Sequence, residues 1–328
     1  MKRGGRYGSV FAALIVSGAL MYYAFEDVHP REIIDSVSHF RPGWIFVIVF
    51  FQAGDLAVRA LRWKILLRPV VNASAWTLYQ VQAISLAMNN LLFFRIGELA
   101  KAVIGGREYG VSTMSVFATV VVERLCDTAA LLAVFSVGAC FVSEGIDPRL
   151  RCWLAVACAG IFSVLLFVVS GGVWLQETKL FKRLERFPAV YRLACDTISG
   201  TRALGSWRAA LEVGALSIGM WLFDGAMFWA GAKAVGLDPD LSYGRSIIVL
   251  ASAAASTALP ALPGAWGNFE AGVKAIIHHF GYAKSSALSY AAFIHLIMYV
   301  TINVMGISFF YRLGHTFDSL RRGLEKKG

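Results

Sequence analysis

The sequence predicts an all-α integral membrane protein with about six full spans and two re-entrant helical hairpins, arranged as two repeats of inverted topology. Three observations support this fold class. Apolar residues make up 57% of the 328 residues and charged residues only 16%, whereas a soluble domain carries about 25% charged residues. The apolar residues form long blocks, two of which are interrupted near the middle. The basic residues gather in alternate connections between the blocks.

Six apolar blocks are each about long enough to cross roughly 30 Å of hydrocarbon as a helix. The core of a soluble protein explains one such block at best, so the set predicts membrane insertion. No small-residue cleavage site follows the first block, and we therefore interpret it as a spanning helix and not as a signal peptide. The six blocks are residues 9–25, 43–58, 112–141, 153–175, 209–232 and 287–311.

The distribution of Lys and Arg predicts the orientation, because cytoplasmic loops of membrane proteins are enriched in these residues. One set of connections holds 22 of the 31 basic residues and the other set holds eight. We place the first set and both termini in the cytoplasm, which makes the chain a multi-pass protein of a prokaryotic cytoplasmic (inner) membrane. These loops account for the net charge of +10, so no nucleic-acid partner is expected. The basic set is 1–8, 59–72, 95–112, 173–208 and 312–328, and the other is 26–42, 143–152, 233–245 and 274–284.

The first hairpin is predicted at residues 78–104. Its two apolar arms are each too short to cross the membrane at 1.5 Å per residue. The polar residues Asn89, Asn90 and Arg95 separate the arms. A full span here would invert every later segment and place the basic connection 173–208 outside. The hairpin is therefore expected to enter and leave on the cytoplasmic side.

The second hairpin is predicted at residues 246–280. Each arm is about 20 Å long, and Pro260 and Pro263 between the arms cannot continue a helix. This hairpin is expected to enter from the outside. The second half of the chain then repeats the first with inverted topology, which is a common plan of transporters. The residues that follow Glu98 and Glu270 also resemble each other.

We expect a single polytopic membrane domain over residues 1–328. The inverted repeats cover about 1–142 and 152–312. Between the spans of the second repeat, residues 176–207 combine apolar residues at near-helical spacing with interleaved Lys and Arg. This pattern predicts an amphipathic cytoplasmic helix on the anionic inner leaflet.

Ionisable groups at membrane depth are costly, and they mark either transport pathways or structural ion pairs. A broken hairpin also exposes backbone polar groups, which is tolerated only against protein or a water-filled cavity. The candidate substrate-binding residues are Asn89, Asn90, Arg95 and Glu98 at the first hairpin, Glu123, Arg124 and Asp127 in the span 112–141, and Trp266, Asn268 and Glu270 at the second hairpin.

Each of these groups also has a structural interpretation. Arg95 has a planar guanidinium suited to phosphate, while Glu98 either contacts a cationic headgroup or pairs with Arg95. Glu123 and Asp127 share one helix face and are expected to point at the first hairpin, in a network with Arg95 and Glu98 or as a lock that holds it. At the start of its helix, Glu270 is favoured by the helix dipole alone.

Four further polar residues lie at membrane depth. Asp55 precedes Arg59 by four residues and is expected to pair with it. Asp224, His295 and Asn303 are expected to face the second hairpin. His295 is interpreted as a helix-packing histidine in preference to a proton relay.

Motifs for ATP hydrolysis or for metal and nucleophilic chemistry are absent from the sequence. The five cysteines show no metal-type spacing. No recognisable nucleophile pattern accompanies the carboxylates of Glu123 and Asp127. We therefore expect no cofactor, no metal and no catalytic residue, in a transporter and not an enzyme.

Three motifs occur in order along the chain. They are Asn-Asn-Leu-Leu-Phe-Phe-Arg-Ile-Gly-Glu at 89–98, Glu-Arg-Leu-Cys-Asp at 123–127, and Leu-Pro-Ala-Leu-Pro-Gly-Ala-Trp-Gly-Asn-Phe-Glu at 259–270. Together they resemble the lysylphosphatidylglycerol synthase transmembrane (flippase-like) family over nearly the whole chain. The resemblance implies lipid translocation, in some relatives of aminoacylated phosphatidylglycerol made by an attached synthase domain. No synthase domain is expected here, because the sequence ends at Gly328. The family often has an arginine where Lys101 stands.

The expected function is a membrane lipid translocase that moves a polar headgroup between leaflets through a cavity between the two hairpins. Arg95 and Arg124 would bind a phosphate, and Glu98, Glu123 and Glu270 would bind a cationic group or protons. The expected partners are an anionic, aminoacylated or isoprenoid-linked lipid, a separate lipid-modifying enzyme and further copies of the chain. A secondary transporter of a small polar solute, a membrane enzyme and a partner subunit in lipid modification stay open as alternatives.

Overall fold

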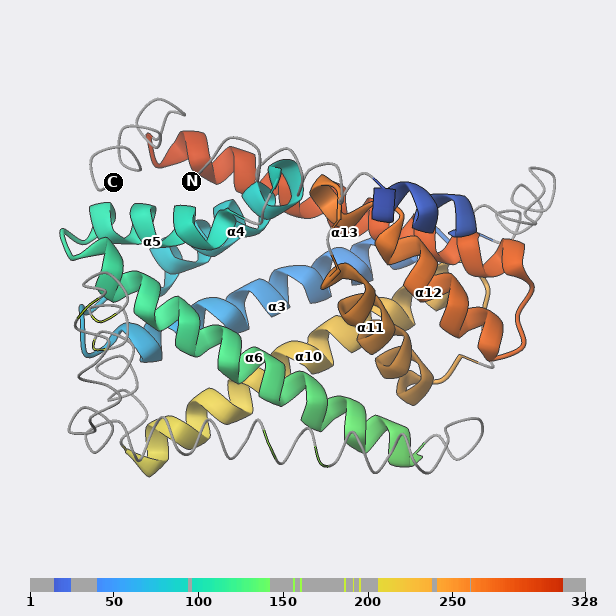
Figure 1. Cartoon of the computed structure of the whole chain (residues 1–328), viewed down its shortest axis with the longest axis horizontal. Helices are drawn as coiled ribbons and strands as arrows, with labels where there is room; N and C mark the ends of the chain where they lie inside the picture. Colours follow the sequence, from blue (N-terminus) through green and yellow to red (C-terminus); the bar gives the residue numbers. More distant parts are fainter. Residues whose placement is uncertain are drawn as a thin grey trace.

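The computed structural model shows helices and no strand among the residues that it describes (Figure 1). These residues are 15–24, 40–93, 96–141, 206–237, 241–259 and 261–314, with the single positions Val156, Gly160, Arg186, Tyr191 and Cys195. The helices are an N-terminal helix (Ile15–Ala24), α3 (Gly43–Leu67), α4 (Ala75–Leu91), α5 (Gly97–Glu108), α6 (Thr113–Phe141), α10 (Trp207–Ala234), α11 (Tyr243–Thr257), α12 (Asn268–His279) and α13 (Lys284–Arg312), with a 3₁₀ turn, η4 (Pro263–Ala265).

Three long helices, α3, α10 and α13, are each long and apolar enough to cross a membrane. They have 25, 28 and 29 residues. At 1.5 Å per residue each exceeds the hydrocarbon thickness of about 30 Å. Helices α3 and α10 pack along each other, and α13 packs against α4. The predicted all-α integral membrane protein is therefore confirmed.

Two helical hairpins lie toward opposite ends of these long helices (Figure 1). The first consists of α4, with 17 residues, and α5, with 12. The second consists of α11, with 15 residues, and α12, with 12. Each arm is about 18–26 Å long, less than the membrane thickness. The helix–break–helix form is observed at both expected places. Re-entry into a bilayer and the inverted repeat stay predictions.

Some predicted features lie outside the described residues. These are the span at 153–175, most of the amphipathic segment 176–207, and the tip residues Arg95 and Pro260. The first predicted span is described over Ile15–Ala24.

The end of the second span differs from the prediction. The sequence analysis ended the apolar block at residue 58 and assigned 59–72 to a basic cytoplasmic connection, but α3 continues to Leu67. Arg62 and Trp63 are completely buried within this extension. The Arg62 guanidinium is neutralised there by the carboxylates of Glu123 and Asp127 on α6.

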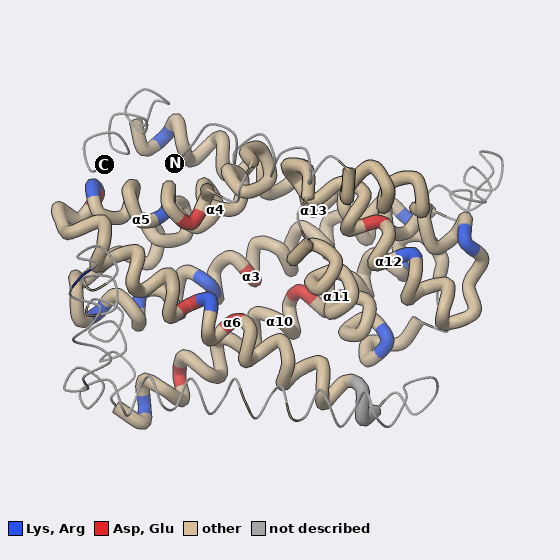
Figure 2. The backbone as a smooth tube through the Cα atoms, in the orientation of Figure 1, with Lys and Arg blue, Asp and Glu red and all other residues tan. Residues whose placement is uncertain are grey.

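The packed interior of the described residues contains two large apolar clusters with a polar zone between them, and a small third cluster of Leu56, Ala83 and Ile302. One large cluster surrounds Trp63 and the first hairpin. The other surrounds Phe228 and Tyr290 and the second hairpin. Figure 2 shows acidic and basic residues close together near the middle of the molecule, on α3, α6 and α10. The candidate site lies in this zone.

Candidate functional site

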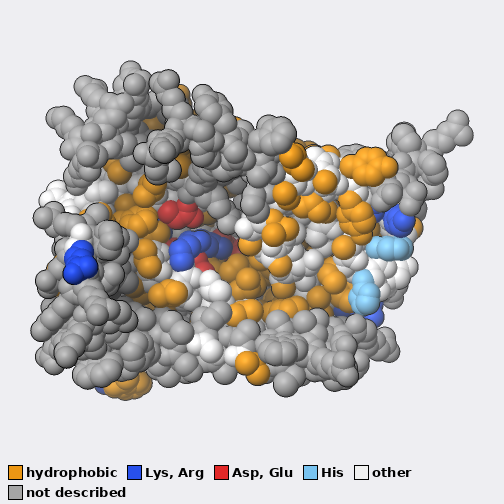
Figure 3. Space-filling view, in the orientation of Figure 1, with side chains coloured by type: hydrophobic (Ala, Val, Ile, Leu, Met, Phe, Trp, Pro, Cys, Tyr) orange, Lys and Arg blue, Asp and Glu red, His pale blue; other side chains and the backbone are white. Residues whose placement is uncertain are grey.

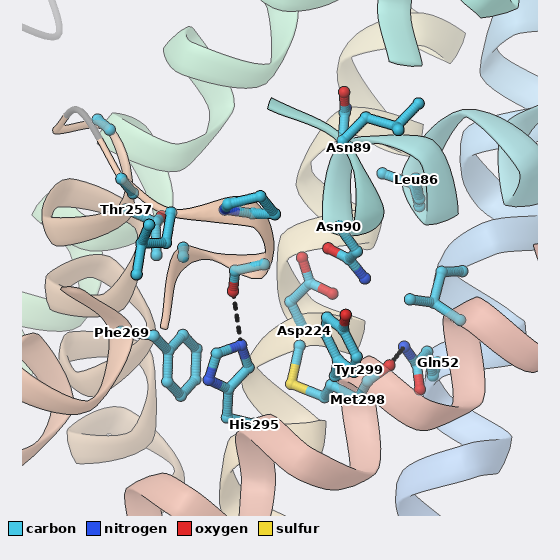
Figure 4. A pocket seen from close by; sticks show the side chains of 18 of the residues that line it. Gln52, Leu86, Asn89, Asn90, Asp224, Thr257, Phe269, His295, Met298 and Tyr299 are labelled. Carbon is cyan, nitrogen blue, oxygen red and sulfur yellow. Dashed lines mark hydrogen bonds between the residues drawn. The ribbon is translucent and has the colours of Figure 1, made fainter. Parts of the chain in front are cut away.

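A cavity of about 640 Å³ lies where the tips of the two hairpins approach each other. The first hairpin contributes Asn89 and Asn90, and the second contributes 257–259 and 261–265. Helices α3, α10 and α13 form the walls. Figure 4 shows side chains from both hairpins around this common space. Segments that are far apart in the sequence thus line one cavity.

The polar wall of the cavity is an ion-pair cluster of Asp55, Arg59 and Asp224. The Nε of Arg59 donates to Asp55 Oδ2 at 2.7 Å, and its Nη2 donates to Asp224 Oδ2 at 3.1 Å. The three residues are between 5% and 9% exposed. The expected pairing of Asp55 with Arg59 is therefore present, and Asp224 faces the second hairpin across the cavity. Two carboxylates share one guanidinium, which leaves a formal excess of negative charge.

The second cluster centres on Glu123, which is completely buried. Lys101 Nζ donates to its Oε2 at 2.5 Å, and Arg62 Nη2 and Gln82 Nε2 donate to its Oε1 at 3.2 and 3.1 Å. These partners come from α3, α4 and α5, so Glu123 on α6 binds three helices together. Lys101 also lies 4.1 Å from the ring centroid of Trp63, a cation–π contact that shields the ammonium.

Asp127 extends this cluster by one helical turn. Arg62 Nη1 lies 2.5 Å from Asp127 Oδ1, and Arg124 Nη2 lies 3.0 Å from Asp127 Oδ2. The Arg124 side chain is 44% exposed. The expected pairing of Arg124 with Asp127 is present. In the space-filling view, basic and acidic side chains meet in a hollow flanked by hydrophobic side chains (Figure 3).

The tip of the first hairpin is held by Asn89. Its Oδ1 accepts from the backbone N–H of Gly97 at 2.8 Å, and its Nδ2 donates to Glu98 Oε1 at 3.1 Å. A Cβ on Gly97 would collide with the carbonyl of Ser85 and with Asn89. A network of Glu123 with Arg95 and Glu98 stays a prediction, because Arg95 lies outside the described residues. The hairpin engages Glu123 through Lys101, one helical turn beyond Glu98.

The tip of the second hairpin is held by Glu270 and His295. Glu270 Oε2 accepts from the backbone N–H of Gly267 at 2.7 Å, and Oε1 lies 2.6 Å from His295 Nδ1. His295 Nε2 lies 2.9 Å from the carbonyl oxygen of Gly264. The rings of Trp266 and Phe269 both lie 4.4 Å from the His295 ring, measured between centroids.

Asn268 connects the second hairpin to the N-terminal helix. It is completely buried. Its Oδ1 accepts from Ser17 Oγ at 3.0 Å, and its Nδ2 donates to the carbonyl of Ser256 at 3.1 Å. The same Ser17 Oγ accepts from the backbone N–H of Leu262 at 2.9 Å. Asn268 therefore fixes the hairpin and does not line the cavity.

The predicted site residues thus fall into two groups. Asn89 and Asn90 line the cavity, whereas the other described ones lie behind it and fix the hairpins or α6. Arg95 lies outside the described residues. The sequence analysis missed Gln52 and Tyr299 as lining residues. Gln52 could have been found, because it lies three residues before Asp55 and shares its helix face.

Among the described residues, no group of three or more His, Cys, Asp or Glu side chains is placed to hold a metal ion. The carboxylates of the site are instead engaged by Arg and Lys. The chemistry of the cavity wall is that of a polar binding surface with fixed charges.

Comparison with known proteins places these features in a family. The family model described as the lysylphosphatidylglycerol synthase TM region matches residues 10–306, which include both hairpins and the cavity. A UPF0104 membrane protein of Methanothermobacter thermautotrophicus is 25% identical over 319 residues, which cover 90% of this chain and 94% of that protein. The chain therefore belongs to the lysylphosphatidylglycerol synthase transmembrane region family.

Proposed function

We propose that this protein is a lipid translocase, in which a polar headgroup crosses through the cavity between the two hairpin tips while its acyl chains stay in the surrounding lipid. The observation that carries the proposal is that both tips line one cavity. A short hairpin that enters from each side would leave only the middle of the membrane to be crossed by polar groups. The family relation supports a lipid as the substrate.

The residues of the cavity wall favour a headgroup that carries hydrogen-bond donors. Arg59 is already engaged by Asp55 and Asp224, and Arg124 is engaged by Glu123 and Asp127. The carboxylates and the amides of the wall therefore accept from amino or hydroxyl groups. An aminoacylated or glycosylated headgroup on a phospholipid or an isoprenoid lipid has such groups. A separate enzyme would supply the modified lipid.

The proposed setting is a prokaryotic cytoplasmic membrane with both termini in the cytoplasm. We propose transport in preference to catalysis because the carboxylates of the cavity are held by a guanidinium, where they are poorly placed to transfer protons to a substrate. A secondary transporter of a polar solute is the second candidate, since the same inverted plan serves it.

A reconstituted flipping assay tests the proposal. Purified protein in liposomes is given lipids with labelled headgroups, and their arrival in the opposite leaflet is followed with a membrane-impermeant quencher. Wild type should move at least one headgroup class faster than protein-free liposomes do. Asp224→Asn should slow this movement about tenfold or more, the effect of losing one charged contact at the binding wall.

The matched control is Glu212→Gln on the same helix. Glu212 forms an ion pair with Arg68 at 3.8 Å, and both side chains are more than half exposed, so flipping should be unchanged. The proposal is rejected if wild type moves no lipid faster than empty liposomes. Uptake of a water-soluble solute without lipid movement would favour the secondary transporter instead.

A further inference from the structure

The second hairpin is connected to α13 by a buried pair of titratable residues that the proposed headgroup contacts leave unused. Glu270 on α12 is 3% exposed and His295 on α13 is 7% exposed. The contact between Glu270 Oε1 and His295 Nδ1 is 2.6 Å, and the opposite ring nitrogen contacts the carbonyl of Gly264 at 2.9 Å. His295 therefore spans from the hairpin arm to the hairpin tip, and Figure 4 shows its ring beside Phe269 at the cavity.

The partners of the imidazole fix how many protons the pair holds. A backbone carbonyl can only accept, so Nε2 of His295 must carry a hydrogen toward Gly264. The remaining contact, between Nδ1 and Glu270 Oε1, needs one more proton. That proton is present whether the pair is written as imidazolium and carboxylate or as neutral imidazole and carboxylic acid. Glu270 Oε2 accepts from the N–H of Gly267, which favours the carboxylate form.

Loss of this one proton breaks one of the two contacts. A neutral imidazole with its hydrogen on Nε2 would turn a lone pair of Nδ1 toward the Glu270 carboxylate. The other tautomer would turn a lone pair of Nε2 toward the Gly264 carbonyl. Both arrangements are repulsive, so only the protonated pair can hold the arm and the tip of the hairpin at the same time.

We propose that His295 and Glu270 form a proton-binding site, and that the bound proton latches the tip of the second hairpin to α13. The latch is closed when the proton is bound and released when the proton leaves. At the tip, Gly264 and Ala265 have φ values of 75° and 57°. Glycine adopts this backbone region at little steric cost, so the backbone at Gly264 is suited to a change of conformation when the latch is released.

Among the described residues, few other charges surround the pair. On α12, Lys274 lies four residues beyond Glu270 and bonds to the carbonyls of Tyr23 and Ala24. On α13, the Tyr299 ring lies 6.2 Å from the His295 ring. Across the cavity are the carboxylates of Asp55 and Asp224 with Arg59 between them, and the described tip residues of both hairpins that line the cavity carry no charge.

Nitrogen-15 NMR of histidine in the full-length protein tests the proton count. With the chain in lipid nanodiscs, the His295 ring should show two protonated nitrogens at about pH 5 and one at about pH 9. The signal is assigned by its loss in His295→Gln. A ring with one protonated nitrogen throughout this range, beside a Glu270 carboxylate that stays ionised, would overturn the proposal.

Hydrogen exchange tests the latch itself. Exchange of the amides in 261–267, corrected for the intrinsic effect of pH, should rise about tenfold in wild type as the proton is lost. His295→Gln should exchange fast at every pH. In Glu270→Gln the carboxamide oxygen can accept from Gly267 while its N–H donates to Nδ1, so this variant should stay protected at every pH.

The two substitutions are thus expected to act in opposite directions, which a merely structural pair would not do. The matched control is His278→Gln, at the exposed end of α12. In this variant, amide exchange in 261–267 should depend on pH as it does in wild type. If Glu270→Gln exchanges as fast as His295→Gln, or if wild type shows no pH dependence, the latch is rejected.

The tip of the second hairpin also lines the cavity, so the latch would affect transport. This role in transport rests on the proposed function. The exchange experiment needs no lipid movement. If the tip shows the pH-dependent exchange but the protein moves no lipid, the proton site stands and the translocase proposal is rejected. If the protein moves lipid but exchange at the tip does not depend on pH, only the latch is rejected.

Discussion

At the scale of residues, the charges in the middle of this protein satisfy one another. Each acidic side chain is paired with at least one basic side chain from another turn or another helix, and the formal charges cancel. Such pairs contribute little net stability, but removal of one partner leaves the others buried and uncompensated. The acidic members are Asp55, Glu123, Asp127 and Asp224, and the basic members are Arg59, Arg62, Lys101 and Arg124.

Glu123→Gln is expected to destabilise the protein strongly. The change leaves the ammonium of Lys101 and the guanidinium of Arg62 without their shared carboxylate, which should lower the free energy of unfolding by about 3 kcal/mol. Equilibrium unfolding in mixed detergent micelles measures this. The exposed-pair variant Glu212→Gln should change it by less than about 1 kcal/mol, and equal effects for the two variants would contradict the assigned roles.

Lys101→Arg and Lys101→Met separate charge from packing at the same position. The arginine keeps a cation beside Glu123 and over the Trp63 ring, so it should retain most of the wild-type stability. The methionine removes the charge and should cost about 3 kcal/mol or more. The same unfolding measurement checks both, and an equal loss for the two variants would show that shape, not charge, matters here.

Local ion pairs could be predicted from the sequence and distant ones could not. Asp55 with Arg59 and Arg124 with Asp127 are separated by four and three residues, distances at which helix geometry alone brings side chains together. The pair of Arg62 and Glu123 is separated by 61 residues. It depends on how α3 packs against α6, which no local pattern specifies.

At the scale of elements, one side chain in each hairpin caps the start of the second arm. Asn89 accepts from Gly97 at the start of α5, and Glu270 accepts from Gly267 before α12. The breaks were predictable because glycine, proline and asparagine interrupt the apolar arms. The extension of α3 was not, since Arg residues at the end of an apolar block usually indicate an interface.

Gly97→Ala is expected to distort the first hairpin. An added methyl group would collide with the carbonyl of Ser85 and with the Asn89 side chain, so the arms must separate at a cost of about 1–3 kcal/mol. Thermal unfolding of the purified protein measures the loss. Gly219→Ala on α10 is the control, because nothing lies within 4 Å of the added Cβ and the change should be neutral or slightly stabilising.

At the scale of the whole molecule, the described residues form the two helical hairpins and the three long apolar helices of an all-α membrane protein, while the inverted repeat and the orientation stay predictions. Composition and hydropathy were sufficient to predict a helical membrane protein, because the length and apolarity of a helix decide whether it can cross a membrane. The shape of the cavity was not predictable, because it depends on which faces of α3, α10 and α13 turn inward.

Cysteine labelling tests the orientation. Arg107→Cys at the end of α5 and Ala283→Cys before α13 are both at exposed positions, in a background where the native cysteines are replaced. A membrane-impermeant maleimide should label Ala283→Cys in intact cells and Arg107→Cys only in inside-out vesicles. Labelling of both from the same side would contradict the inverted arrangement of the hairpins.

The bond between Ser17 and Asn268 has a consequence for biogenesis. The two residues are separated by 251 positions in the chain, so at about 5–20 residues per second the ribosome takes roughly 13–50 s to make the second after the first. On the predicted topology, the N-terminal helix lies in the bilayer during that time without its final neighbour. The described helix, Ile15–Ala24, carries no charged residue. It can therefore remain exposed to lipid at little cost until the last part of the protein is inserted.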